Sequence, residues 1–304
     1  MKINLSTRDI ETTLVLGRTL NFRQAATQLH LSQSALSTQI ARIEEALAVR
    51  LFDRTTRTVR LTAAGEVFLQ KAALLQAAFR DTLDAVSGIA NAERGKVAVA
   101  ALPSLAARML PRILIDYHRA RPEVALRVFD TLSGPAFDLV RAGEVDFALT
   151  AADPQQADLH YEPLMSDRFV LLMRADDPLA TAPGPLRWAD CTDAPHVSMT
   201  NPSSVRQYAE WAFLQNRIRF QPVFEAEHLA TIAAMVKCGF GVAALPEIAA
   251  ATVRQAGVVE RLLEAPVAER SIGLVTLRNR PLSPAAVALA NAVRTHAANA
   301  AGNT

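Results

Sequence analysis

The chain has 304 residues, half of them hydrophobic and 20% charged, with a formal net charge of +2. This length favours two or three domains with substantial cores, and the composition excludes a disordered polyelectrolyte. The charge is uneven, because residues 1–61 contain nine Lys and Arg residues against five Asp and Glu, a net charge of +4 that leaves −2 for the rest. A basic segment on a slightly acidic body is typical of a region that meets phosphates.

Cysteine content and hydropathy indicate in which cellular compartment the protein is expected. Two cysteines, Cys191 and Cys238, are too few for a disulfide framework and favour a reducing environment. The first thirteen residues lack the apolar segment of a signal peptide, and the most apolar stretch, near residues 229–251, is interrupted by a lysine, a proline and a glutamate. We therefore expect a cytoplasmic protein with no membrane partner.

The N-terminal segment predicts three helices, at residues 7–17, 22–29 and 33–47. The last two are joined by the three-residue turn His30-Leu31-Ser32, and Ser32 is placed to cap the third helix. Apolar positions recur on one face of that helix: Leu36, Ile40, Ile43 and Leu47. Two helices joined by so short a turn cross steeply, which is helix-turn-helix geometry.

The opposite face of the third helix carries short or polar side chains that can approach base edges. A merely solvated polar face would show the same pattern, and periodicity does not separate the two interpretations. The next segment favours the interpretation of this face as one that contacts DNA bases. After the apolar pair Leu51-Phe52, the residues Arg54, Arg57 and Arg60 recur in a Thr/Val-rich stretch suited to a two-stranded wing that meets phosphates or the minor groove.

Residues 21–69 resemble the DNA-binding region of the LysR-type transcriptional regulators. The matching motifs are F-x-x-A-A, S-Q-S-A-L-S-x-Q-I, I-E-x-x-L, L-F-x-R-x-x-R and L-T-x-x-G, all within about 50 contiguous residues. The resemblance implies a winged helix-turn-helix over residues 1–61. It implies base contacts by Gln33, Ser34, Ser37 and Thr38, and contacts to the DNA backbone or minor groove by Arg23, Arg42, Arg54 and Arg57.

Three positions of this segment affect its expected base preference or its backbone conformation. Thr38 stands where many members of the family carry Arg, so base preference there should differ. Ala48-Val49 replaces the commoner Leu-Gly before the wing, which leaves the entry to the wing less defined. His30 follows the second helix, where a left-handed residue is often needed, and His tolerates that conformation better than most residues other than glycine.

Residues 62–90 contain no proline and predict one long helix. Its apolar positions step alternately by four and three residues, and the predicted dimer seam is Phe68, Ala72, Leu75, Phe79 and Val86. This pattern favours a coiled-coil homodimer over a single amphipathic helix packed on its own domain. The family resemblance also implies such a linker helix, further assembly into a homotetramer, and RNA polymerase as a partner. Residues 91–95 are the predicted hinge.

From residue 96 onward, strands and helices alternate, which predicts an α/β domain with parallel sheets covered on both faces. The predicted strands are 96–102, 124–129, 145–150, 168–174, 195–199, 222–226, 241–245 and 271–277. The predicted helices are 104–119, 135–142, 203–217, 228–238, 246–256 and 284–299.

The segments GEVDFAL at 143–149 and GFGVAALP at 239–246 extend the resemblance to the family's C-terminal domain. That resemblance implies a periplasmic-binding-protein-like domain over residues 96–304, in which the chain crosses twice between two α/β subdomains. We expect subdomain I to contain about residues 96–167 and 268–304, and subdomain II about residues 168–267.

Ligands of open α/β sheets bind at the carboxyl ends of strands, near helix N-termini. This rule selects polar residues that follow strands and begin helices: Ser104, Ser133, Asn201, Ser203 and Ser204. Each serine could equally be an ordinary helix cap. In the family the matching positions line the effector pocket, and His228 occupies another position that faces it, although a lone histidine at a helix start can also be structural. Several helix N-termini favour an anionic effector.

Three other functions are less consistent with the sequence. An enzyme is disfavoured because the sequence contains no nucleophile elbow, Walker loop, dinucleotide-binding motif or zinc-protease motif. The six histidines are scattered without the spacing of metal ligands, so we expect neither a metal site nor a cofactor. A transport binding protein would not explain the N-terminal region. A redox sensor would use Cys191 and Cys238, whose apolar settings give no sign of activation. The sequence thus predicts a sequence-specific transcription regulator controlled by a small-molecule effector.

Overall fold

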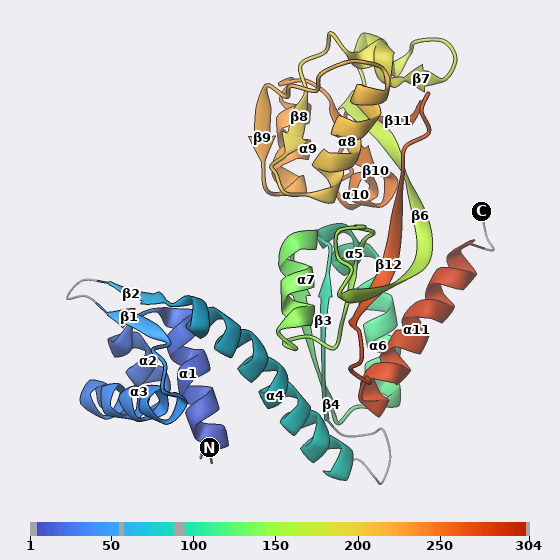
Figure 1. Cartoon of the computed structure of the whole chain (residues 1–304). Coiled ribbons are helices and arrows are strands. Elements are labelled where there is room, and N and C mark those ends of the chain that lie inside the picture. Colours follow the sequence, from blue (N-terminus) through green and yellow to red (C-terminus); the bar gives the residue numbers. More distant parts are fainter. Residues whose placement is uncertain (1–4, 55–57, 88–94, 302–304) are drawn as a thin grey trace. The chain divides into compact units, whose positions relative to one another are not determined.

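The computed structural model describes residues 5–54, 58–87 and 95–301. The chain forms two compact units, one built from residues 1–89 and the other from nearly all of residues 90–304 (Figure 1). No helix among the described residues is long and apolar enough to cross a membrane.

The N-terminal unit contains four helices and a two-stranded ribbon. The helices are α1 (Thr7–Thr19), α2 (Phe22–Gln28), α3 (Gln33–Leu47) and α4 (Ala63–Ser87), and the strands are β1 (Phe52–Arg54) and β2 (Val59–Leu61). The predicted apolar face of α3 is confirmed, because Leu36, Ile40 and Ile43 are at most 1% exposed. They pack in one core with Leu16, Ala25, Ala26, Leu51 and Phe52. The small pair Ala25-Ala26 lets α2 approach its neighbours closely.

Local capping fixes the ends of these helices. The Ser32 hydroxyl accepts a hydrogen bond from the Ala35 N–H at 3.1 Å, as the sequence predicted. His30 has a φ of 54°, so the expected left-handed residue after α2 is confirmed. Ala48, with a φ of 55°, ends α3 in the same conformation, which lets the chain turn into the ribbon without a glycine. The ribbon strands are antiparallel, with Phe52 opposite Leu61, and form the wing.

The C-terminal unit is organised around one eight-stranded sheet. Its strands run in the order β4 (Val124–Asp130), β3 (Gly95–Ala101), β5 (Phe147–Ala151), β12 (Glu269–Leu277), β6 (Leu159–Arg174), β11 (Val258–Glu264) and β7 (Leu186–Arg187), with β10 (Ala243–Pro246) also paired to β6. A separate parallel pair is formed by β8 (Val197–Met199) and β9 (Phe224–Ala226). The helices are α5 (Pro103–Arg108), α6 (Leu110–Ala120), α7 (Ser133–Arg141), α8 (Ser204–Gln215), α9 (Leu229–Lys237), α10 (Glu247–Thr252) and α11 (Pro284–Ala301).

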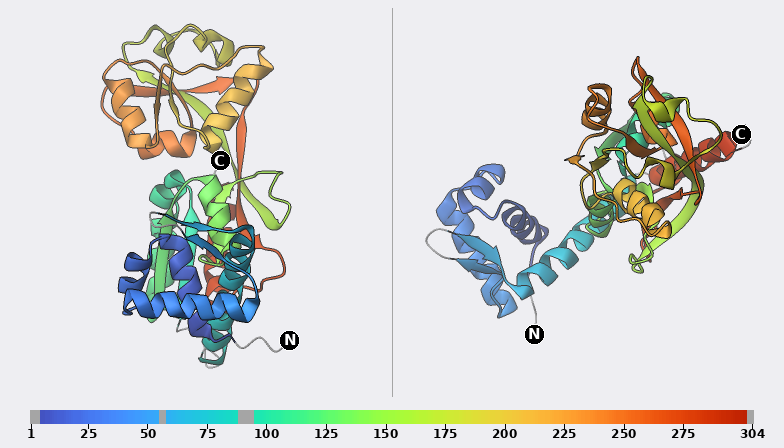
Figure 2. Two further views of the ribbon diagram at one scale, coloured as in Figure 1. Left: turned by 60° about the vertical axis from the view of Figure 1, so that its left-hand side comes forward. Right: turned by 90° about the horizontal axis from the view of Figure 1, so that it is seen from above.

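Two long antiparallel strands, β6 and β12, connect the two halves of this unit (Figure 2, left). The buried side chains form separate cores on either side of the crossing. One core contains residues from 169 to 268, and two adjoining cores contain residues from 97 to 159 and from 272 to 297. We call the part with residues 95–167 and 269–301 subdomain I and the part with residues 168–268 subdomain II. The chain leaves subdomain I along β6 and returns along β12, as the resemblance implied.

The sequence prediction missed the strands β7 and β11 and was wrong in two further details. The sheet is mixed rather than parallel, because β12 runs antiparallel to β5 and β6, while β10 and β11 run antiparallel to β6. A strand that carries the chain back across the crossing must run opposite to the one that carried it out. The predicted helix 104–119 is two helices, because Pro111 lies in the first turn of α6 and cannot donate the hydrogen bond that a continuous helix requires.

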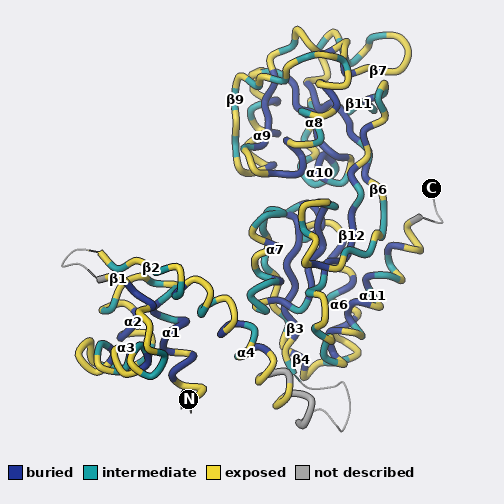
Figure 3. The backbone as a smooth tube through the Cα atoms, in the orientation of Figure 1, coloured by how far each residue is buried: buried dark blue, intermediate teal, exposed yellow. Residues whose placement is uncertain are grey.

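The strand β3 lies in the core of subdomain I. In β3 the residues Val97, Val99, Ala100 and Ala101 are at most 1% exposed, and the strand is buried along most of its length (Figure 3). The carboxyl ends of β3, β4 and β5 lead into or lie beside the loops that start α5 and α7. Parallel strands place these loops at a common edge, so the fold presents several helix beginnings at one end of subdomain I.

Candidate functional site

The outer face of α3 is available to a partner. Gln33, Ser34 and Thr38 are exposed and Ser37 is partly exposed, while the other face of the same helix is in the core. Two of these side chains are locally restrained: the Thr38 hydroxyl donates to the Ser34 carbonyl at 3.0 Å, and the Ser34 and Ser32 hydroxyls lie 3.0 Å apart. Gln33, in the first turn, has the longest of these side chains. The exposed face of α3 therefore presents hydrogen-bonding groups on both short and long side chains.

Basic residues beside this face are placed differently from one another. Arg23 is exposed in the first turn of α2. Arg54 ends β1, but its side chain lies outside the described residues, as does Arg57 altogether. Arg60 on β2 is exposed. The N-terminal unit thus combines a polar helix face with exposed arginines on α2 and the wing.

Arg42 has a partner within the protein. Its guanidinium forms an ion pair with Asp9 of α1, whose side chain is buried, while Arg42 itself remains largely exposed. Asp9 also accepts hydrogen bonds from Gln39 at 3.1 Å and from the N–H and hydroxyl of Ser6. Asp9 therefore connects the start of α1 to two positions on α3. The ion pair with Arg42 helps to hold α3 against α1 in the absence of DNA.

This cluster has a pH dependence with a definite sign. Burial alone would raise the pKa of Asp9, but hydrogen bonds from Ser6, Gln39 and Arg42 lower it from 3.8 to about 2. The native state therefore gains stability above the unfolded pKa and loses it as pH falls through the folded pKa. We expect Asp9→Asn to reduce the free energy of unfolding by about 2 kcal/mol at neutral pH, and the difference to shrink between about pH 4 and pH 2.

Urea unfolding of the native protein and of Asp9→Asn, followed by circular dichroism over this pH range, measures the difference. Glu45→Gln, at an exposed position of α3, is the matched control and should leave the unfolding curve almost unchanged. A difference between Asp9→Asn and the native protein that does not vary with pH would contradict the assignment.

Helix α4 presents apolar side chains that the unit does not cover. Leu75, Phe79 and Leu83 are 58%, 47% and 51% exposed. With Ile10 and Leu5 they line a groove of about 570 Å³ between α4 and the start of α1. The other seam positions lie elsewhere: Ala72 is buried and Phe68 partly buried, both against α1, and the side chain of Val86 is outside the described residues. The part of α4 around Phe68 and Ala72 thus packs on its own unit, as a single amphipathic helix would. The part around Leu75 and Phe79 leaves apolar side chains uncovered, as a dimer seam would before pairing.

In the C-terminal unit, one buried cluster joins residues from both subdomains. Ser104 in the first turn of α5 and Ser204 at the start of α8 both accept hydrogen bonds from the Arg270 guanidinium, at 3.4 and 3.2 Å. Arg270 also donates to Asp167 at 2.7 Å. All four residues are at most 5% exposed. The structure thus brings together two of the predicted effector residues, through an arginine and an aspartate that the prediction missed.

The other predicted effector residues have separate roles. Ser133 begins α7 and accepts a hydrogen bond from the buried Thr150 at 3.0 Å. Ser203 is the N-cap of α8, because its hydroxyl accepts from the Arg206 N–H at 3.2 Å, and Asn201 is exposed. His228 precedes α9 without capping it. Burial raises the pKa of Asp130, and the charge of His228 opposes that effect.

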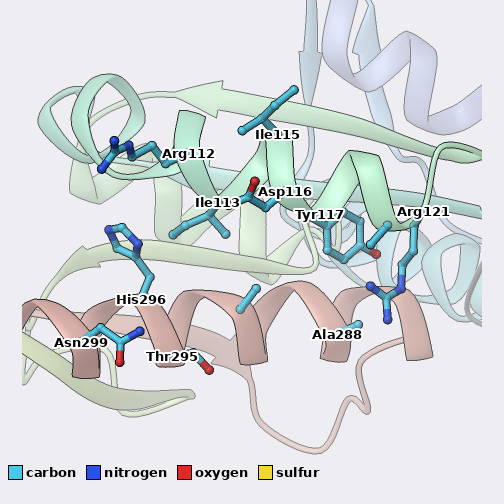
Figure 4. Close-up of a pocket in the computed structure, with 12 residues that line it drawn as sticks. Arg112, Ile113, Ile115, Asp116, Tyr117, Arg121, Ala288, Thr295, His296 and Asn299 are labelled. Carbon is cyan, nitrogen blue, oxygen red and sulfur yellow. The ribbon is translucent and has the colours of Figure 1, made fainter.

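A separate groove of about 690 Å³ lies between α6 and α11 and contains none of the predicted effector residues (Figure 4). Arg112 and Asp116 of α6 line it together with Arg121, which directly follows that helix, and Thr295 and His296 line it from α11. Among the residues that the structure describes, no group of three or more His, Cys, Asp or Glu side chains is arranged to hold a metal ion.

The surroundings of Cys191 show no sign of an activated thiol. Cys191 is fully buried, and burial raises the pKa of its thiol to about 12, so the thiol stays protonated. Its neighbour His196 is also buried, and burial lowers the pKa of that imidazole. Cys238 is exposed at the end of α9. A thiolate-based sensor therefore has no support in the surroundings of Cys191.

Comparison with known proteins gives matches over nearly the whole chain. The model of bacterial regulatory helix-turn-helix proteins of the lysR family matches residues 7–66, and the model of the LysR substrate binding domain matches residues 90–298. The transcriptional regulator YfeR of Shigella flexneri is 31% identical over 96% of this chain and 94% of its own length. YbhD of Escherichia coli K12 is 29% identical over 90% of this chain and 86% of its own length.

Solved structures agree. A full-length OxyR variant from Pseudomonas aeruginosa superposes with a TM-score of 0.76 at 26% identity, over 96% of this chain and 95% of that one. CbnR, a LysR family transcriptional regulator, superposes with a TM-score of 0.69 at 18% identity, over 96% and 99%, and supports the fold. The predicted winged helix-turn-helix, linker helix and two-part α/β domain are thus confirmed. The chain belongs to the LysR family of bacterial transcriptional regulators.

Proposed function

We propose that the protein binds promoter DNA in a sequence-specific manner as a homodimer and that a small anionic effector, bound between subdomains I and II, controls this binding. The observation that carries the proposal is the two-sided α3, which buries Leu36, Ile40 and Ile43 and leaves Gln33, Ser34 and Thr38 open to solvent. A helix held by one face and polar on the other meets the geometric requirement for reading a major groove.

Reading and positioning fall to different residues in this proposal. Gln33, Ser34, Ser37 and Thr38 contact base edges, and a glutamine can pair with both N6 and N7 of adenine. Arg23, Arg54 and Arg57 bind phosphates or the minor groove and set the register without reading sequence. Arg42 has a double role, because its ion pair with Asp9 uses part of the guanidinium while its exposure leaves other N–H groups for a phosphate.

Dimerisation follows from the uncovered groove of α4. A second copy of the same helix would bury Leu75, Phe79 and Leu83, whose exposure is high for large apolar side chains in one row. Two recognition helices would then read two half-sites. One structural neighbour is a full-length CbnR in complex with its target DNA, which has the same fold. The homotetramer and the contact with RNA polymerase that the resemblance implied remain part of this proposal.

Control by the effector requires that it bind one arrangement of the subdomains more tightly than another. The start of α8 and the serines on both sides of the crossing support a ligand at this place. Ser133, Asn201, Ser203 and His228 are the further candidates for contact with it. Thiol oxidation at Cys191 is disfavoured, because burial raises the pKa of its thiol to about 12.

Fluorescence anisotropy tests the proposal. The full-length protein is titrated onto its own gene's upstream DNA and onto a scrambled fragment, at two salt concentrations. We expect a preference of about a thousandfold for the native fragment and a steep loss of affinity at the higher salt. Equal binding of both fragments at both salt concentrations would contradict sequence reading.

A further inference from the structure

The position of the wing depends on contacts where its first strand begins. Among the described residues, β1 and β2 form three residue pairs, from Phe52 opposite Leu61 to Arg54 opposite Val59. A two-stranded ribbon of this size is marginally stable in water without contacts to the rest of the protein. The direction in which the wing extends is therefore set at residues 50–52, which we call the wing root.

Glu44 of α3 binds the backbone N–H groups of the wing root. Its Oε1 atom accepts hydrogen bonds from the N–H of Leu51 at 2.8 Å and from the N–H of Phe52 at 3.0 Å. The side chains of Leu51 and Phe52 are each 1% exposed and pack in the core of the N-terminal unit. Their burial fixes where the root lies, and the two hydrogen bonds fix how its peptide groups are oriented. Because the acceptor is a carboxylate, these bonds are stronger than bonds between neutral groups.

Thr62, which directly precedes α4, binds the carbonyl groups of the same root. Its hydroxyl donates to the Arg50 carbonyl at 2.7 Å and accepts from the Gly65 N–H, in the first turn of α4, at 3.0 Å. Its backbone N–H donates to the Leu51 carbonyl at 3.0 Å. A side chain at Gly65 would collide with that carbonyl, so glycine lets α4 begin directly against the root. The root is therefore held by α3 through its N–H groups and by the start of α4 through its carbonyls.

These contacts account for residues of the sequence motifs to which the proposed function assigns no DNA contact. Glu44 is the acidic residue of I-E-x-x-L, and Thr62 and Gly65 belong to L-T-x-x-G. A carboxylate in a basic segment repels the phosphates that the segment meets. Electrostatics by themselves therefore predict that removal of Glu44 raises DNA affinity. Its two hydrogen bonds to the wing root predict the opposite, so the two roles can be told apart by experiment.

We propose that Glu44 is a positioning residue for DNA binding, which holds the wing root so that the wing and the outer face of α3 contact one duplex together. This inference rests on the proposed function, in which arginines of the wing bind phosphates or the minor groove, and adds the residue that places them. Glu44 touches no DNA in this account. It acts through β1, which begins at Phe52 and ends at Arg54.

Loss of the carboxylate has a definite consequence for the wing. The N–H groups of Leu51 and Phe52 then lose their acceptor in a partly buried place, which costs free energy unless their peptide groups rotate to meet water. Such a rotation changes the direction of β1, and the short ribbon follows it. The wing then spends less time where its arginines meet phosphates. Because phosphate contacts carry no sequence information, binding weakens on all DNA alike.

Anisotropy titrations of the full-length protein on the promoter fragment and on scrambled DNA test the inference. We expect Glu44→Ala to weaken both fragments about tenfold and to reduce the salt slope by about one, because a phosphate contact of the wing is lost. Glu44→Gln keeps an oxygen that can accept from both N–H groups and should stay within about threefold of the native affinity. Glu45→Ala, at the neighbouring exposed position of α3, is the matched control. It removes the same charge and should not weaken either fragment.

A double-mutant cycle with Arg54→Ala separates positioning of the wing from stability of the fold. Each variant is titrated at a temperature well below its own unfolding midpoint. Since Glu44 acts through the wing, Glu44→Ala should weaken the Arg54→Ala variant less than it weakens the native protein. A general loss of stability would weaken both by the same factor. Should Glu44→Ala not fold, Thr62→Val removes the other anchor of the root and should show the same pattern, and Thr62→Ser, which keeps the hydroxyl, should restore binding.

Three results would overturn the inference: native affinity and salt slope in Glu44→Ala, equal losses in Glu44→Gln and Glu44→Ala, or full additivity with Arg54→Ala. Failure of the proposed function gives a different result, because the native protein would then bind the promoter and scrambled fragments equally. Even in that case the comparison of Glu44→Ala with Glu45→Ala decides the role of Glu44, since contacts between the wing and phosphates contribute to all DNA.

Discussion

Replacement of both Leu75 and Phe79 by glutamate is expected to abolish the homodimer and to lower affinity for a two-half-site operator about a hundredfold or more. Both side chains are about half exposed on α4 and line the groove beside α1. Two glutamates on each copy would bring like charges together and remove the apolar surface that a second helix would cover. A monomer would then bind one half-site at a time.

Sedimentation velocity measures the assembly, and anisotropy on the promoter fragment measures the affinity. Gln70→Glu is the matched control, because Gln70 is exposed on the opposite side of α4 and should leave both measurements unchanged. Since none of the three positions is buried, the circular dichroism spectrum should stay that of the folded protein. A double variant that remains dimeric with native affinity would show that the seam lies elsewhere.

Gln33→Ala is expected to lower affinity for the preferred site by about tenfold to a hundredfold and to leave affinity for scrambled DNA almost unchanged. Gln33 is exposed in the first turn of α3, and its amide carries both a donor and an acceptor, so it can distinguish one base pair from another. Truncation to alanine keeps the helix and its buried face. The loss should therefore be confined to sequence preference.

Arg23→Ala provides the contrast. An exposed arginine that binds a phosphate contributes to all DNA alike, so its removal should weaken both fragments by a similar factor and reduce the salt slope by about one. Competition titrations at several salt concentrations measure both effects. Equal consequences of the two substitutions on the two fragments would contradict the division between reading and positioning.

The DNA-binding unit was predictable from the sequence because its structure is decided locally. The turn His30-Leu31-Ser32, the cap at Ser32 and the apolar face of α3 all act within a few residues of one another, and each is present in the structure as expected. The role of Asp9 was not predictable in this way. Its partners Gln39 and Arg42 lie some thirty positions further along the chain, and pattern reasoning assigned Arg42 to DNA alone.

The buried cluster of Ser104, Ser204, Arg270 and Asp167 shows the same limit. Helix-start rules selected Ser104 and Ser204 correctly as neighbours in space, because both follow strands of an α/β fold. Arg270 and Asp167 gave no signal, since a charged residue at the edge of an apolar strand normally reaches solvent. They are buried because β6 and β12 cross between subdomains side by side, and that pairing joins positions 103 residues apart. The antiparallel pairing, where the sequence predicted a parallel sheet, has the same long-range cause.

Selection of preferred sites from a random double-stranded DNA library, with the full-length protein and with the Leu75→Glu and Phe79→Glu double variant, tests the central claim most directly. The account predicts that the native protein enriches a sequence with two inverted half-sites whose centres are separated by a whole number of helical turns, and that the double variant enriches at most one half-site. Enrichment of no sequence by the native protein, or of the same paired half-sites by the double variant, would contradict a dimer that reads DNA through α3.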